Sequence, residues 1–140
     1  MNRSYAVYKL FNQTTGDKIT EFFSPEKTGR IKTLQDYKRA GYSLISNERV
    51  DIERYLNLKI DNDVEEYVSQ DKHEVEIRNK YESGKTTERV YIDTLKLIEE
   101  YRGSCLRKLK FHLSWLQHRD FDCTNETAIE LYNSFILAQV

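Results

Sequence analysis

Apolar and polar residues alternate in the first part of the chain, which predicts a two-stranded hairpin. Residues 4–11 are rich in the β-branched and aromatic types that favour strands. One face of this strand carries Tyr5, Val7 and Phe11. The run 14–17, Thr-Thr-Gly-Asp, is a turn signal, and residues 18–23 return as a second strand that ends before Pro25. We therefore expect strands over 4–11 and 18–23.

A short helix and a third strand are expected to follow the hairpin. Apolar positions recur at helical spacing from residue 34, and Thr33 with Asp36 three residues later offers a capping pair. Gly41 stands where a left-handed residue would end this helix. Residues 42–45 then predict a short third strand, so residues 1–50 are predicted to form a ββαβ unit.

The middle of the chain fits two patterns. A helical face would carry Val64, Val68 and Val75. Residues 61–63 offer an acidic start to this helix, and Gly84 offers an end. Alternation on both sides of the turn-like residues 82–85 instead favours a strand hairpin across 73–92. We favour the helix and keep the hairpin as the alternative for 63–83.

The last third of the chain shows helical periodicity throughout. A first stripe, capped by Thr86 or Thr87, contains Val90, Thr94, Leu97, Ile98 and Tyr101. A second stripe over 104–118 contains Leu106, Leu109, Leu113 and Leu116. Gly103 either separates two helices or lies inside one long helix. The pattern leaves both arrangements open.

A final helix is predicted after the polar connection 120–125, with Thr124 or Asn125 as its cap. Its broad apolar face contains Ala128, Ile129, Leu131, Tyr132, Phe135 and Ile136. A face this wide needs more than one neighbour, so we expect it to pack between other helices or against a second chain. A homodimer is therefore one of the expected partners.

These elements together predict an α+β protein, with an N-terminal ββαβ unit followed by a mainly helical C-terminal part. The expected subdomains are residues 1–50 and 51–140, with one continuous domain over 1–140 as the alternative. A chain of 140 residues is the usual size of a single domain.

Composition and charge narrow the expected environment. The chain has 22 Lys and Arg against 23 Asp and Glu, a formal net charge of −1, so no bulk attraction to nucleic acid or membrane is expected. The mean hydropathy is −0.75, no apolar run approaches the length of a membrane span, and the N-terminus lacks the features of a signal peptide. With two cysteines predicted to be free thiols, we expect a cytoplasmic protein.

Few residues are grouped in the ways that catalysis or metal binding requires. The sequence has no glycine-rich phosphate loop, no Cys-x-x-Cys pair and no His-Glu-x-x-His motif, so we expect no catalytic residues, no metal and no cofactor. Cys105 is expected to be a small buried apolar residue. Glu74 and Glu76 with Lys80 leave a metal-dependent nuclease as the third hypothesis.

Three stretches are candidate binding surfaces, and the first is basic. Its cations are Lys27, Arg30, Lys32, Lys38 and Arg39. Tyr37 and Tyr42 lie among them, and aromatic faces can stack on bases while cations neutralise phosphates. This surface suggests a nucleic-acid-binding regulator, with an ordinary solvated face as the alternative.

The second surface is acidic and lies between residues 61 and 76. Its carboxylates are Asp61, Asp63, Glu65, Glu66, Asp71, Glu74 and Glu76, with Lys72 as the only cation. Such a row could imitate a phosphate backbone in the basic groove of a partner. The alternative is an exposed, highly soluble helix.

The third surface is aromatic. Phe111 and Trp115 are four residues apart and point away from the leucine stripe of the same helix, with Lys108 and His118 on their side. A helix with two apolar faces is either sandwiched inside the fold or exposed as an interface. As an interface, Lys108, Phe111 and Trp115 would bind a partner together with the acidic row.

In length and composition the chain resembles accessory proteins of phages and mobile elements, and among these it is similar to anti-CRISPR and other anti-defence inhibitors. The local feature in keeping with this resemblance is the acidic run 61–76. The resemblance implies a non-catalytic inhibitor in the host cytoplasm that blocks a nucleoprotein machine, such as a CRISPR effector, by occupying its surface. Its partner would be a protein or a protein–nucleic acid complex.

Overall fold

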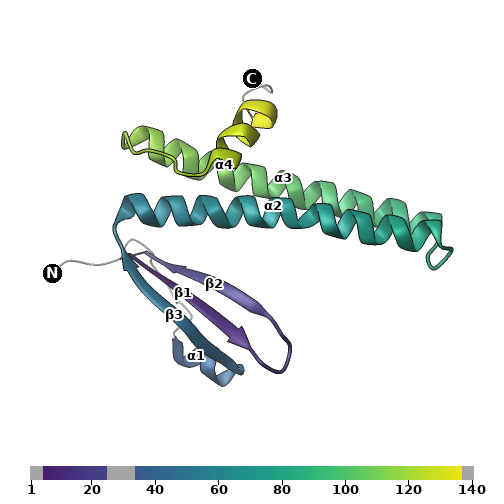
Figure 1. The fold of residues 1–140 in the computed structure, drawn as a ribbon, viewed down its shortest axis with the longest axis horizontal. Coiled ribbons are helices and arrows are strands. Elements are labelled where there is room, and N and C mark those ends of the chain that lie inside the picture. Colours follow the sequence, from purple (N-terminus) through teal and green to yellow (C-terminus); the bar gives the residue numbers. More distant parts are fainter. Residues whose placement is uncertain (1–4, 25–33, 137–140) are drawn as a thin grey trace. The chain divides into compact units, whose positions relative to one another are not determined.

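A computed structural model describes residues 5–24 and 34–136 (Figure 1). The described elements are β1 (Tyr5–Asn12), β2 (Lys18–Phe23), α1 (Leu34–Arg39), β3 (Tyr42–Val50), α2 (Ile52–Glu82), α3 (Glu88–His118), α4 (Glu126–Leu131) and the π-helical turn η1 (Tyr132–Ile136). The chain divides into two compact units, residues 1–55 and 56–140. The predicted α+β class, with N-terminal strands followed by helices, is confirmed.

The first unit contains a three-stranded antiparallel sheet in the order β2-β1-β3. The predicted hairpin is confirmed, and Gly16 has a φ of 77° in its turn. The third strand is longer than the predicted 42–45, because β1 pairs with β3 along its whole length, from Tyr5 with Val50 to Asn12 with Tyr42. Gly41 ends α1 with a φ of 94°, as predicted. Thr33, the predicted capping residue, lies outside the described residues.

Both faces of β1 are buried, although the sequence pattern predicted only one. On one face, Tyr5 packs against Tyr55 of the first turn of α2, with ring centroids 4.7 Å apart. Phe11, assigned to this face, is only half-buried. On the other face Leu10 is 1% exposed, and the amide of Asn12 donates to the carbonyl of Ala40 just after α1.

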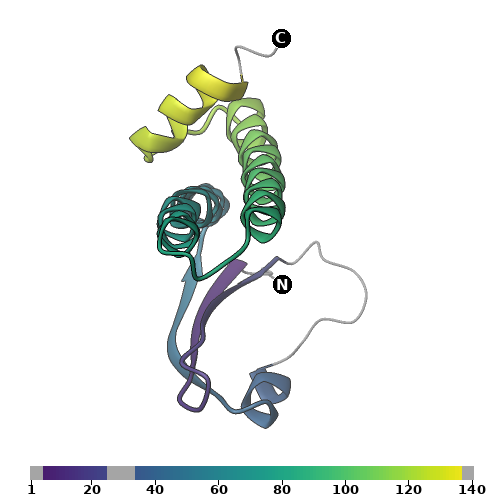
Figure 2. The same cartoon turned by 90° about the vertical axis from the view of Figure 1, so that its right-hand side faces the viewer.

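The second unit is a long antiparallel hairpin of α2 and α3, which lie side by side along their length (Figures 1 and 2). The favoured helical prediction for 63–83 is correct, and the strand hairpin across 73–92 is wrong because both segments are helical. α2 begins earlier than the predicted acidic start at 61–63, since Asp51 caps it by accepting a 2.9 Å hydrogen bond from the Arg54 amide. Gly84, with a φ of 74°, follows its end as predicted.

The core of this hairpin lies between the two helices. The buried apolar residues are Leu56, Ile60, Val64 and Ile77 from α2, and Ile98, Cys105, Leu109, Leu113 and Leu116 from α3. The predicted valine face of α2 is therefore wrong beyond Val64, since Val68 and Val75 are 47% and 48% exposed. They lie more than about 100° around the helix from Asp63, which faces α3.

α3 is one continuous helix with Gly103 inside it, so the single-helix alternative is correct. Thr87 caps its N-terminus, and its side chain accepts from the Val90 amide. The leucine stripe is confirmed as core, apart from the half-buried Leu106. The first stripe is wrong as a core prediction, because only Ile98 of its five residues is buried.

After α3 the chain continues into α4 and η1, and η1 packs on α3. Asn125 caps α4 by accepting a 2.9 Å hydrogen bond from the Ala128 amide, as one of the two predicted caps. Ala128 is fully buried, while Ile129 and Phe135 stay 42% and 47% exposed. Neighbours within the second unit thus cover only part of the broad apolar face. No helix among the described residues is long and apolar enough to cross a membrane.

Candidate partner-binding surfaces

The acidic row does not form one surface, because several of its carboxylates turn toward α3. Oδ2 of Asp63 lies 2.5 Å from Nδ1 of His112, and the Asp63 side chain is only 5% exposed. A carboxylate that is covered and bonded in this way is not available to a partner. Asp63, which was predicted to bind a partner, is therefore part of the contact between α2 and α3 instead.

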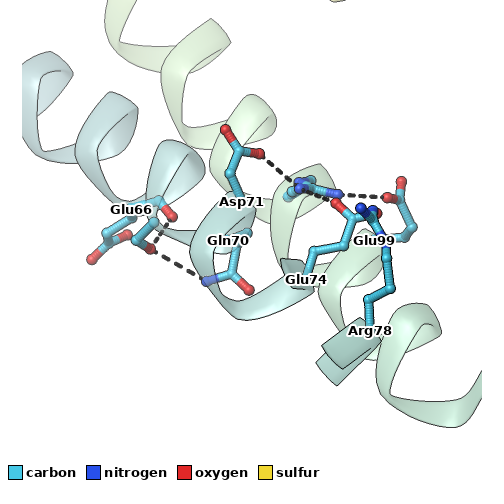
Figure 3. Close-up of polar contacts among 8 residues, drawn as sticks. Glu66, Gln70, Asp71, Glu74, Arg78 and Glu99 are labelled. Atoms are coloured by element: carbon cyan, nitrogen blue, oxygen red, sulfur yellow. Dashed lines mark hydrogen bonds and ion pairs between the residues drawn. The ribbon is translucent and has the colours of Figure 1, made fainter. Parts of the chain in front are cut away.

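Two further carboxylates of the row, Asp71 and Glu74, accept hydrogen bonds from Arg102 of α3. Figure 3 labels these two carboxylates and marks their bonds as dashed lines. The Arg102 guanidinium lies 2.8 Å from both Asp71 and Glu74, and 2.9 Å from Glu99 of its own helix. Its side chain is 13% exposed, so this cluster is partly shielded from solvent. The hydrogen bond from Arg102 lowers the pKa of Glu74, and Glu74 in turn raises the pKa of Arg102.

Three other members of the row lie outside this cluster. Asp61 is exposed and accepts a 2.9 Å hydrogen bond from Asn125, while Glu65 is exposed. Glu66 is half-buried, with a carboxylate oxygen 3.9 Å from Nζ of Lys108. A mimic of a phosphate backbone would present evenly spaced, unpaired charges, whereas this row is divided by its pairing with α3.

The aromatic surface on α3 is open to solvent. Phe111 is 58% exposed, and its ring centroid lies 5.7 Å from that of the half-buried Trp115. The guanidinium carbon of Arg119 lies 5.7 Å from the Trp115 ring centroid, within the range of a cation–π contact. The Lys108 side chain is 56% exposed beside them. We call Lys108, Phe111, Trp115 and Arg119 the aromatic patch.

The exposure of Phe111 answers the question that the sequence left open. Within the described part of the chain, the helix is not sandwiched at Phe111, so the exposed alternative holds at this position. On the opposite side, Leu109, Leu113 and Leu116 are 5% exposed or less, which holds the helix in place. Arg119 was missed, although it lies four residues after Trp115, at the spacing that places two side chains together on a helix.

The basic surface is described only in part. Lys38 and Arg39 are exposed at the end of α1, whereas Lys27, Arg30 and Lys32 lie outside the described residues. Tyr37 is not a free stacking platform, because it is 7% exposed and its ring packs edge-on against Tyr42. Burial and a hydrogen bond to Glu21 raise the pKa of Tyr37 to about 12.

The two cysteines, Cys105 and Cys123, are free thiols with no disulfide between them. Burial raises the pKa of both Cys105 and Cys123, and Cys105 is buried as predicted. Over residues 5–24 and 34–136, no three His, Cys, Asp or Glu side chains are placed to hold a metal ion. The nuclease arrangement fails locally, since Glu74 bonds to Arg102 and Glu76 lies about 160° around α2 from it.

One surface feature had no sequence signal. A half-open groove of about 290 Å³ lies between the end of α3, the connection that follows it, and α4 with η1. The residues that line it include Leu113, Leu116, Phe121, Cys123, Ile129 and Tyr132. The groove depends on how three separate segments pack, which no local pattern records.

Comparison with known proteins adds no family to these surfaces. The chain matches no protein-family model, no curated protein and no solved structure.

Proposed function

We propose that this protein is a non-catalytic binding protein that inhibits a nucleoprotein machine, such as a CRISPR effector, by occupying its surface with the aromatic patch. The observation that carries this proposal is the 58% exposure of Phe111 beside Trp115, on a helix whose opposite face is core. Exposed aromatic pairs are costly in water and are common at the centres of protein interfaces.

The composition of the patch suits a protein partner. Trp and Arg are the residue types most enriched among interface side chains with large energetic effects, and here Arg119 lies over the Trp115 ring. The buried leucines on the other side of α3 hold the backbone before binding, so little conformational entropy is lost. A concave apolar site with acidic groups around it would complement the patch.

The inhibitory role is supported by resemblance rather than by a contact. In length and composition the chain is similar to anti-defence inhibitors, and a stoichiometric inhibitor needs a binding surface but no grouped reactive side chains. Of the acidic row, Glu66 stays closest to the patch through its 3.9 Å approach to Lys108. The proposal therefore assigns binding to α3, not to phosphate mimicry.

The test uses the full-length protein to capture its partner from a host lysate, with and without nuclease treatment, followed by mass spectrometry and quantitative binding. Trp115→Ala should weaken binding by about 30-fold or more, equivalent to about 2 kcal/mol. Ile129→Ala is the matched control, because Ile129 is an apolar residue with 42% exposure outside the patch. Undiminished affinity in Trp115→Ala would overturn the proposal.

A further inference from the structure

We infer that the aromatic patch is one end of a longer seam on α3, and that this seam binds an amphipathic helix of a protein partner. The partner helix carries carboxylates in the part that contacts residues 104–119. The inference rests on the proposed function and specifies the chemistry of the partner at that site.

The seam follows from the spacing of residues along α3. Val90, Leu97, Ser104 and Phe111 recur every seven residues. Between them, Thr94, Tyr101, Lys108 and Trp115 recur at the same interval. This alternation of three and four residues is the pattern by which one helix packs along another. We call these eight residues the open seam.

The open seam lies beside the face that packs on α2, and Glu66 of α2 reaches its edge at Tyr101 and Lys108. Val90, Leu97, Tyr101 and Phe111 are 49%, 64%, 42% and 58% exposed, whereas the neighbouring Ile98 and Leu109 are 1–2% exposed. Along the helix axis the open seam extends for roughly 38 Å, at about 1.5 Å per residue. A second helix that lies along α3 can cover a straight stripe of this length from one end to the other.

The charges around the open seam indicate which charges the flanks of the partner helix carry. The segment from Ser104 to Arg119 contains no Asp or Glu, while its cations are Arg107, Lys108, Lys110 and Arg119. The preceding half, residues 88–103, mixes Asp and Glu with Lys and Arg. Glu66 of α2, 3.9 Å from Lys108, is a carboxylate that borders this cationic half. An occupant with acidic flanks at this end would therefore be electrostatically complementary.

Two other occupants fit these observations less well. A second copy of the chain in parallel would place the cationic halves together, and in antiparallel it would face that half with a nearly neutral one. Single-stranded nucleic acid would use the aromatic rings and the cations, but it would gain little from Val90 and Leu97, whose exposed surfaces are aliphatic.

The test measures the fluorescence of Trp115, the only tryptophan of the chain, in the full-length protein. The probes are two synthetic tryptophan-free helical peptides with the same leucine heptads, one flanked by Glu and one by Lys, together with an oligothymidine. The Glu-flanked peptide should shift the emission to the blue and bind at least tenfold more tightly than the Lys-flanked peptide. Equal binding of the two peptides, or tighter binding of the oligothymidine, would overturn the inference.

Variants at the far end of the open seam make the test specific. Leu97→Asn should weaken binding of the Glu-flanked peptide at least tenfold, although Leu97 lies far from the aromatic patch. Ile92→Asn is the matched control, because Ile92 is 42% exposed on another face of α3. The affinity of this variant for the Glu-flanked peptide should stay within twofold of that of the wild type. Both positions are exposed, and circular dichroism is used to check that each variant is folded. An unchanged affinity in Leu97→Asn would overturn the inference, as would a dimer by sedimentation that Leu97→Asn dissociates.

The two proposals fail in different ways when the captured partner is tested. If Trp115→Ala abolishes its binding and Leu97→Asn does not, the open seam is wrong and the aromatic patch stands. If neither variant affects it, the proposed function itself is wrong.

Discussion

Nδ1 of His112 lies 2.5 Å from Oδ2 of Asp63, and this contact joins α3 to α2 inside the helical hairpin. The two side chains are 12% and 5% exposed, so the pair is largely removed from water. A polar pair in this position sets the pairing of the two helices, because any axial shift would leave both groups buried without a partner.

Removing the carboxylate should therefore destabilise the hairpin. Asp63→Ala leaves the imidazole buried without this acceptor, and we expect the free energy of unfolding to fall by about 2 kcal/mol. Urea denaturation followed by circular dichroism measures the change. Glu65→Ala, at an exposed position on the same helix, should change stability by less than about 0.5 kcal/mol. Equal stabilities of the two variants would contradict a structural role for the pair.

The Arg102 cluster should make the second unit sensitive to acid. Arg102 lowers the pKa of Glu74 below its ordinary value of 4.5, so this contribution to stability is complete above pH 4.5 and is lost as the pH falls through the lower folded value. Arg102→Met should cost about 1–3 kcal/mol at neutral pH, with a smaller deficit below pH 4.5. Unfolding free energies measured across this range provide the test, with the exposed Arg107→Met as the control. A deficit that stays constant with pH would contradict this role.

Asn57 should hold the connection between α3 and α4. Its amide donates to the carbonyl of Asp122 at 3.0 Å, and its Oδ1 accepts from the Thr124 amide at 2.9 Å. Asn57→Ala removes both bonds, and we expect faster hydrogen exchange over 121–131 while α2 and α3 keep their protection. Exchange followed by mass spectrometry resolves the two regions. Uniform deprotection of the whole second unit would show that Asn57 supports the core instead.

Tyr37 should contribute to the alkaline unfolding of the first unit. Its pKa is raised from 10 to about 12, mainly by burial and also by its hydrogen bond to Glu21. A raised folded pKa gives stability that is present below the unfolded value and is lost as the pH rises from about 10 toward 12. Tyr37→Phe should therefore lose less stability over this range than the wild type. The comparison between the two proteins is needed because the pKa values of Tyr67 and Tyr101 are also raised.

The sequence by itself determined most of the secondary structure, because the signals for those elements are local. The turn at Gly16, the stop at Gly41, and the caps Thr87 and Asn125 all act through their own backbone neighbours. The leucine stripe also identified the core side of α3, since a 3.6-residue period is visible without knowing what covers it. Phe111 and Trp115 were candidates for the same reason, as the direction of their side chains follows from the period.

Only the tertiary structure decided which apolar stripes are covered and which carboxylates are paired. Val90, Leu97 and Tyr101 have the same spacing as core residues, yet they stay 42–64% exposed, whereas Ile98, the next residue after Leu97, is buried. Likewise Asp63 and Glu65 look equivalent in the acidic row, but the turn of α2 points Asp63 at His112, 49 residues away. Burial and pairing depend on neighbours distant in sequence. The helical period shows in which direction a side chain points, but not which residue covers it or pairs with it.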